Sequence, residues 1–172
     1  AQIAGPPDQP KSQSILAFLE NEIGLQALRE DRLDEAARRF EAAVDLDGSI
    51  VTAFVHLGDV RLRQDDLPGA VSTWERALDV SPDRAYLALD RLERAYARMN
   101  TPARFAELCR KLITASPREW RARAALARHL SAQGRPNEAF ELLLEALEHN
   151  PHALAIHQAI WNTLSVLDLP KA

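Results

Sequence analysis

The sequence has 172 residues, of which 47% are hydrophobic and 27% charged, and its formal net charge is −4 at pH 7. These values are typical of an ordinary globular chain and exclude a disordered one, and the lack of any run of about eighteen apolar residues excludes a bilayer-spanning helix within it. The single cysteine, Cys109, excludes an internal disulfide and a cysteine-based metal site, and we expect it to be a packed hydrophobe.

Residues 1–11 contain three prolines and one glycine, a composition that predicts a disordered lead ahead of a single folded domain over residues 12–172. The segment lacks the charged-then-apolar order of a signal peptide. Since the sequence does not begin with Met, we expect a mature form or a piece of a longer protein.

Small and aromatic residues then recur with a period of 34 residues. The spacing predicts repeats over about 14–48, 49–82, 83–117 and 118–151, the third with one extra residue. A fixed period in this range indicates stacked supersecondary units, none of which can bury its apolar face alone. Four pairs of equivalent residues carry the match between the first two repeats: Gly24 and Gly58, Ala36 and Ala70, Phe40 and Trp74, and Ala43 and Ala77.

Each repeat is predicted to be a pair of helices. Apolar residues at i, i+3, i+4 and i+7 over 32–47, 66–81 and 135–150 indicate amphipathic helices. Short polar turns precede them, as at 30–32 and 64–66, and these are long enough only to join antiparallel helices. We therefore expect an all-α chain of about four helix-turn-helix hairpins.

Ser–Pro and Asn–Pro pairs stand at the repeat boundaries. Ser81, Ser116 and Asn150 are each expected to cap a helix whose first residue is the proline that follows. Glu119 is expected to complete a capping box with Ser116, and Asp47 to cap the helix after the first repeat.

The second repeat resembles the tetratricopeptide (TPR) repeat, whose L-G…A-x₃-F…P skeleton stands here as Leu57, Gly58, Ala70, Trp74 and Pro82. The resemblance covers most of the chain and implies a right-handed α-solenoid of about four hairpins. Small residues would let the two helices of a hairpin approach, and an aromatic residue would fill the space beside them. The third repeat departs from the pattern at its packing positions, which hold Glu93, Phe105, Cys109 and Leu112.

In the TPR family the first helix of each hairpin lines a concave groove that binds segments of other proteins. Residues 84–135 carry 12 basic and 4 acidic side chains, so the expected partner is an acidic protein or peptide. The carboxylate clamp of chaperone-binding members is not reproduced, because its Lys and Asn positions hold Leu25, Asp59, Arg94 and Arg128. The candidate partner-binding residues are Leu25, Asp59, Leu87, Arg91, Arg94, Arg98, Arg121, Ala124 and Arg128.

A further apolar helix is expected over about 152–168, as a cap on the solenoid. Trp161 stands where the repeat has its glycine, which leaves no room for a closely packed partner helix. Because this helix carries more apolar side chains than one neighbouring hairpin would cover, we expect it to meet another domain or to mediate self-association.

The sequence contains no Gly-rich phosphate loop, G-x-S-x-G elbow or H-E-x-x-H helix. We therefore expect a chain that is not an enzyme and that needs no cofactor. His149, His152 and His157 span a turn and two helices, which argues against a zinc site. The acidic net charge, together with a basic stretch that lacks interleaved aromatics, argues against nucleic-acid binding.

Residues 88–117 and 149–164 are similar to the later repeats of the lipopolysaccharide assembly protein B family. The similarity implies a bacterial adaptor on the cytoplasmic side of the inner membrane, tethered by a segment outside this chain, that controls lipopolysaccharide synthesis through regulated proteolysis of a biosynthetic enzyme. The C-x-x-C metal domain of that family is not present in this sequence. Two alternatives stay open: a TPR module of a secretion or pilus complex, and the regulatory part of an enzyme whose catalytic domain lies outside this chain.

Overall fold

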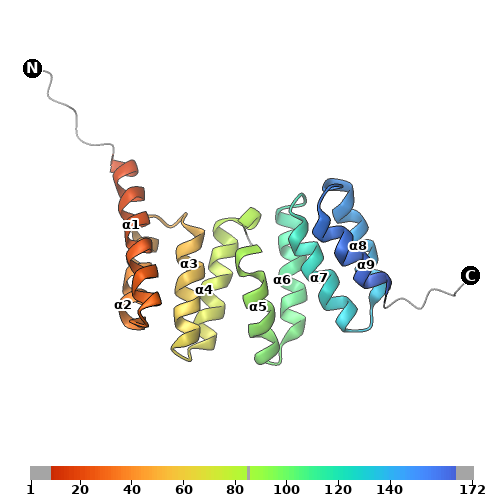
Figure 1. The fold of residues 1–172 in the computed structure, drawn as a ribbon, viewed down its shortest axis with the longest axis horizontal. Helices are drawn as coiled ribbons and strands as arrows, with labels where there is room; N and C mark the ends of the chain where they lie inside the picture. The colour runs from red at the N-terminus through yellow and green to blue at the C-terminus, as the bar shows by residue number, and fades with distance from the viewer. Residues whose placement is uncertain (1–8, 85, 166–172) are drawn as a thin grey trace, which may run out of the picture. The chain divides into compact units, whose positions relative to one another are not determined.

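The computed structural model describes residues 9–84 and 86–165, in which every regular element is a helix (Figure 1). The expected all-α fold of helical hairpins followed by a final helix is therefore confirmed. In chain order the elements are α1 (Gln9–Arg29), α2 (Leu33–Leu46), α3 (Val51–Arg63), α4 (Leu67–Val80), the 3₁₀ helix η1 (Pro82–Arg84), α5 (Tyr86–Arg98), α6 (Pro102–Ala115), α7 (Trp120–Ala132), α8 (Pro136–His149) and α9 (Leu154–Leu164).

The chain divides into two compact units, and the division falls within α5, between Ala88 and Leu89. In the first unit α1 packs against α2, α2 against α3, and α3 against α4. In the second unit α6 packs against α7, α7 against α8, and α8 against α9. Within each unit these helices pack against their neighbours in sequence, which is the arrangement of stacked hairpins. The single domain expected over residues 12–172 stays a prediction.

All four hairpin turns have the same backbone geometry. One residue in each turn has a positive φ: Asp31 (59°), Asp65 (63°), Asn100 (55°) and Gly134 (75°). The N–H of the residue that follows donates to the carbonyl five positions back, as from Arg32 to Ala27, Asp66 to Arg61, Thr101 to Tyr96 and Arg135 to Leu130, each at 2.9 Å. This is the Schellman arrangement, which ends a helix on a left-handed residue and satisfies its last carbonyls.

In each of the first two repeats, a small residue on the first helix faces a large ring on the second, and this fit lets the two helices pack closely. A methyl group on Gly58 would lie 2.3 Å from Nε1 of Trp74, and one on Gly24 would lie 2.7 Å from the ring of Phe40. Both rings are fully buried, and Trp74 Nε1 donates to the carbonyl of Val55 at 3.1 Å. The glycines are therefore required for the close approach of the two helices, as the repeat pattern predicted.

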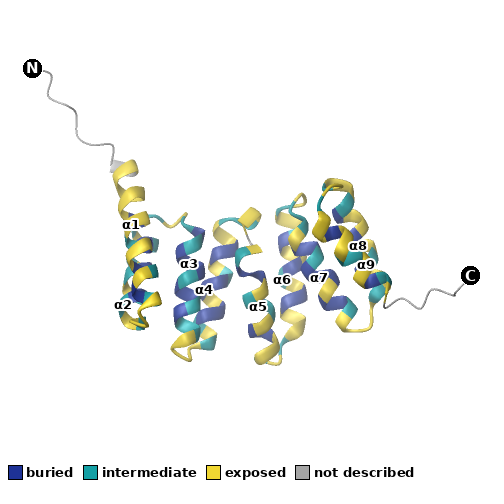
Figure 2. Cartoon of the chain, in the orientation of Figure 1, coloured by how far each residue is buried: buried dark blue, intermediate teal, exposed yellow. Residues whose placement is uncertain are grey.

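The third hairpin reverses the order of small and large side chains. Phe105, Cys109 and Leu112 are all buried at positions where the other hairpins have a small, a large and a small residue. Glu93 replaces the glycine, and the small side chain of Cys109 stands opposite it instead of an aromatic ring. In the fourth hairpin Ala127 faces Leu143, an intermediate case. Figure 2 shows the resulting buried faces along α6, α7 and α8.

The Ser–Pro and Asn–Pro pairs do not begin the following α-helices, so this prediction was wrong. Ser81, Ser116 and Asn150 instead end the preceding helices, and their N–H groups donate to the carbonyls four residues back. A further turn follows each proline, and α5, α7 and α9 begin three or four residues later. The proline stops the earlier helix because it has no N–H to continue it.

The two predicted side-chain caps also act differently. Glu119 caps α7 directly by accepting from the N–H of Arg121 at 2.8 Å, without the expected capping box with Ser116. Asp47 accepts from the N–H of Ser49 at 3.0 Å in the link between α2 and α3, and the N-cap of α3 is Ile50. Asp47 therefore shapes the link and does not cap the helix.

The ends of the described chain bear on two further expectations. Helix α1 begins at Gln9, so residues 9–11 of the expected disordered lead are helical, and residues 1–8 lie outside the described part. Helix α9 falls within the expected cap, whose last residues, 166–168, also lie outside it. Among the described helices, none combines the length and the apolar character needed to cross a bilayer.

Candidate interaction surface

The candidate residues on α1 and α3 are only half-exposed, whereas residues that contact a partner need to be accessible to it. Leu25 is half-buried and packs against the core of the first hairpin, and Asp59 of α3 is half-buried. Beside them Asn21 is buried, and its Oδ1 lies 3.2 Å from Nδ1 of His56. The His56 ring lies in turn against Phe40, with the ring centroids 5.2 Å apart. This face of α1 and α3 is largely occupied by the protein's own side chains.

The basic residues of α5 and α7 differ in how far they are engaged. Arg128 bridges two carboxylates of α5, with Nη2 3.0 Å from Oδ1 of Asp90 and a further ion pair to Glu93. The hydrogen bond to Glu93 and the attraction of both carboxylates raise the pKa of Arg128. The basic excess of residues 84–135 is therefore partly neutralised at Arg128, by acids that the sequence places 35 and 38 residues away.

Two arginines of α5 are exposed and carry no such pair. Arg94 donates from Nε to the carbonyl of Asp90, one turn earlier on the same helix, at 3.0 Å. Arg98 follows one turn later and is also exposed. No carboxylate pairs with either guanidinium within residues 9–84 and 86–165, so both offer their charge to solvent.

The remaining candidates are placed as follows. Arg121 is exposed, pairs with Glu119 at 3.1 Å and lies over the Trp120 ring, with 4.9 Å between Cζ and the ring centroid. Leu87 and Arg91 of α5 and Ala124 of α7 are half-buried. Of these, Ala124 gives α7 a short apolar stretch beside its charged side chains.

The family is decided by the repeat pattern itself. The tetratricopeptide repeat model matches residues 21–86 and again residues 57–119, which together span more than half of the chain. The chain belongs to the tetratricopeptide repeat family. The TPR fold supports a protein–protein interaction scaffold, as the sequence predicted.

Two curated relatives match parts of the chain. The TPR domain-containing protein PYG7 of Arabidopsis thaliana chloroplasts is 38% identical over 68 residues, which is 40% of this chain and 23% of that protein. The peroxisomal targeting signal receptor of Candida albicans is 32% identical over 115 residues, which is 64% of this chain and 18% of that protein. The chain thus spans less than a quarter of either relative.

Solved TPR structures agree with the fold over most of the chain. MamA superposes with a TM-score of 0.57 at 15% identity, covering 88% of this chain and 82% of that one. YrrB superposes with a TM-score of 0.51 at 18% identity, covering 87% and 76% respectively. At these identities the likeness establishes the fold alone.

Arg123 is a basic residue whose structural role the TPR pattern could have shown. It lies on α7 at the position that Phe54 occupies in α3, and it is only 6% exposed. Its Nη1 donates to the carbonyl of Pro117 at 2.6 Å, and its Nε lies 3.4 Å from Glu145. Arg123 therefore replaces an apolar side chain in the hairpin core and is not part of the basic surface.

Cys109 and the histidines show no site for metal or redox chemistry. Burial raises the pKa of the Cys109 thiol to about 12, and the nearby carboxylate of Glu93 contributes to this rise. The thiol therefore stays protonated at neutral pH. His157 lies 2.8 Å from the carbonyl of Pro151, and no group of three or more metal-ligating side chains forms in the described part of the TPR domain.

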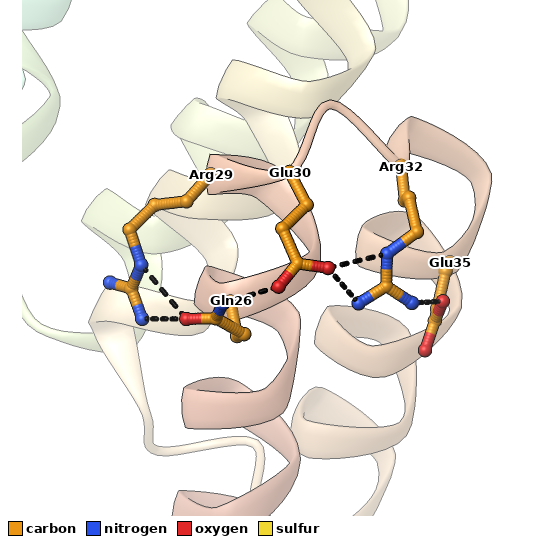
Figure 3. Close-up of polar contacts among 5 residues, drawn as sticks. All are labelled: Gln26, Arg29, Glu30, Arg32 and Glu35. Carbon is orange, nitrogen blue, oxygen red and sulfur yellow. Dashed lines mark hydrogen bonds and ion pairs between the residues drawn. The ribbon is translucent and has the colours of Figure 1, made fainter.

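Polar side chains gather at the turn of the first hairpin (Figure 3). The carboxylate of Glu30 accepts from Gln26 and from Arg32, which also pairs with Glu35. These hydrogen bonds, with the charge of Arg32, lower the pKa of Glu30. The five residues are exposed or half-buried, so the network covers the turn without enclosing a site. Its members are Gln26, Arg29, Glu30, Arg32 and Glu35.

Proposed function

We propose that this chain is an interaction scaffold that holds an acidic, extended segment of another protein against α5 and α7. The observation that carries the proposal is the pair of exposed arginines, Arg94 and Arg98, one turn apart on α5 without a carboxylate partner. A guanidinium forks onto a carboxylate through two parallel N–H donors, so two of them on one helix face suit a segment with spaced acidic residues.

The neighbouring side chains would define how such a segment lies. Arg121 and the half-buried Ala124 extend the same kind of surface onto α7. Asp90 and Glu93 share the single positive charge of Arg128, so negative charge remains on α5 at this point. This charge would repel a segment bound in a register that sets its acidic residues next to Asp90 and Glu93. The half-buried Arg91 completes the proposed surface on α5. Leu25, Asp59 and Leu87 belong to the first compact unit and stay separate candidates there.

The names of two similar proteins support binding of a peptide segment. YrrB is described as a TPR protein with an unusual peptide-binding site, and the Candida albicans relative is named as a receptor for a targeting signal. Our proposal assigns the chain no catalytic step and no cofactor. It takes the partner to be a protein or peptide, and not nucleic acid.

Reversing the two exposed charges tests the proposal. Arg94→Glu combined with Arg98→Glu is expected to weaken binding of the partner recovered by affinity capture by at least about tenfold, and added salt to weaken wild-type binding, because exposed charges are screened over about 10 Å at 0.1 M. Isothermal titration of the full chain measures both effects.

The matched control reverses Arg110 and Arg118, which are exposed on α6 and in the link before α7. Arg128 is a poor target, because Arg128→Glu would set a third carboxylate beside Asp90 and Glu93 and disturb the helix packing. Equal loss of binding in the test and control variants would show only a general charge effect, and unchanged binding in the test variant would exclude this face.

For the specific role we propose an adaptor in bacterial lipopolysaccharide synthesis, acting through regulated proteolysis of a biosynthetic enzyme. The support is the similarity of residues 88–117 and 149–164 to the later repeats of lipopolysaccharide assembly protein B. The cytoplasmic location, with a tether outside this chain, belongs to the same proposal. Co-purification of that enzyme with the chain, lost in the Arg94/Arg98 double reversal, is the expected result.

The expected role of the final helix in self-association or domain contact stays a proposal. Ile156 is fully buried and Ile160 and Leu164 are half-buried, whereas Leu154 and Trp161 are 69% and 72% exposed. Two separate side chains offer less surface than the sequence suggested. The measurement on α1 described below includes a Trp161 variant and so tests α9 as well.

A further inference from the structure

Helix α1 carries an apolar face that its own hairpin does not cover. Half of the ten exposed large hydrophobic side chains in the described residues lie on this one helix. Figure 2 shows that α1 has many exposed residues along its length. At about 100° per residue, Ile15, Leu19 and Ile23 fall within roughly 80° of the helix circumference. The exposed fractions are 61% for Ile15, 51% for Leu16, 57% for Phe18, 48% for Leu19 and 42% for Ile23.

The repeat register shows that this face is a packing surface. Leu19 and Ile23 of α1 correspond to Ala53 and Leu57 of α3, which are 0% and 3% exposed where α3 packs against α2. In α7, which packs against α6, the corresponding pair is Ala122 and Leu126, each 2% exposed. Helices α3 and α7 therefore bury these positions, and Leu57 packs with residues of the preceding hairpin, whereas in the described part of the chain α1 leaves the positions exposed.

The spacing of the exposed residues points to a second copy of the same chain. Ile15 and Ile23 lie four residues on either side of Leu19. In an antiparallel pair of α1 helices related by a two-fold axis at Leu19, Leu19 would face its own counterpart and Ile15 would face Ile23 of the partner copy. An isologous contact of this kind needs one self-complementary patch, which this triplet provides.

We infer that this chain associates as a two-fold dimer through the exposed face of α1, centred on Leu19. The inference goes beyond the proposed function, since it concerns a different surface and a different partner.

The size of the surface fits a dimer. Helix α1 has 21 residues, against 14 for its hairpin partner α2, so its first turns extend beyond α2 (Figure 1). A helix of that length is roughly 30 Å long. Five exposed apolar side chains of this size present on the order of several hundred Å², a patch size that marks interaction sites. The polar residues along α1 would supply the rest of the roughly 800 Å² per partner that a stable interface buries.

A charge-swap experiment on the full chain tests both the surface and its symmetry. Leu19→Glu and Leu19→Lys each place like charges on the axis, and each is expected to raise the dimer dissociation constant by at least about tenfold. Mixing the two variants places opposite charges on the axis and is expected to restore the dimer. Sedimentation velocity over a wide concentration range gives the dissociation constants, and circular dichroism checks the fold. Trp161→Ser, on α9, is the matched control and is expected to leave the dimer unchanged.

Several results would overturn the inference. A wild-type chain that is monomeric at every concentration excludes the dimer, and an unchanged dimer in both Leu19 variants excludes α1. Loss of the dimer in Trp161→Ser alone assigns it to α9. If the two Leu19 variants are monomeric and remain so when mixed, the two-fold pairing at Leu19 is wrong and another helix is the occupant of this face.

Discussion

The two residues that face each other across a hairpin differ in size from repeat to repeat, and where one is larger the other is smaller. Glycine faces an aromatic ring in the first two hairpins, a glutamate faces the cysteine in the third, and an alanine faces a leucine in the fourth. Each pair fills a similar space, because hairpin interiors are packed densely and tolerate neither a void nor an added methyl group. In the third repeat the larger Glu93 is therefore offset by the smaller Cys109, and the repeat keeps the packing of the pattern with different residues.

We expect Gly58→Ala to destabilise the chain by about 1–3 kcal/mol, the typical cost of overpacking. The added methyl group would meet Trp74, which is fully buried and held by its hydrogen bond to Val55, so the ring cannot move aside cheaply. Urea unfolding of the full chain measures the change. Gly48→Ala is the control, since a methyl group there lies 3.7 Å from the nearest atom and should be nearly neutral. Equal stability of the two variants would contradict the proposed packing.

Single residues of the candidate surface were only partly predictable from the sequence. The positions of Arg94 and Arg98 follow from helix periodicity, and both are exposed as expected of surface arginines. The pairing of Arg128 with Asp90 and Glu93 joins two helices of successive repeats, and no local pattern contains it. The burial of Arg123 was readable in principle, because the repeat register places it at a core position.

At the scale of helices and turns, the sequence predicted the hairpins better than the joints between them. The hairpin turns are local: a left-handed residue and its two hydrogen bonds suffice, and Asp, Asn or Gly marks each one. The joints depend on how one hairpin packs on the next. Their Ser–Pro and Asn–Pro pairs have the composition of a helix start, yet they end the previous helix, and the next one begins where packing places it.

The turns predict opposite effects for two exchanges of glycine. Asp65→Gly is expected to stabilise the chain by up to about 1 kcal/mol, because a side chain at positive φ is strained and glycine is not. Gly134→Ala is expected to destabilise it by about 1 kcal/mol for the same reason, since an added methyl group meets no atom within 4 Å and only the backbone is affected. Thermal unfolding of both variants decides. A change of the same sign in both would show that the turn conformation does not govern these sites.

The exposed face of α1 illustrates what a sequence pattern omits at the scale of elements. The repeat register makes Ile23 a packing position, since the equivalent residues Leu57 and Leu126 are buried in α3 and α7. Whether such a position is covered depends on the presence of a neighbouring hairpin, which the pattern of one helix does not encode. The helix assignment was therefore available from the sequence, and its open face was not.

At the scale of the whole molecule, repeat number, helical class and family follow from one period of 34 residues. That period needs no knowledge of long-range contacts, since each unit packs mainly on its neighbours in sequence. The partner is a different matter, because TPR scaffolds share their packing residues and differ in the exposed ones. Here the exposed basic residues of α5 carry the functional proposal.

The central claim is that the first helices of the hairpins, and not the second, meet the partner. Site-specific photocrosslinking tests it most directly, with a benzophenone amino acid at Ala97 of α5 or at Arg110 of α6, both of which are exposed. Position 97 lies beside Arg94 and Arg98 without removing either charge. We predict that the partner recovered by affinity capture crosslinks strongly from position 97 and weakly from position 110. Strong crosslinking from position 110 with none from position 97 would contradict the account.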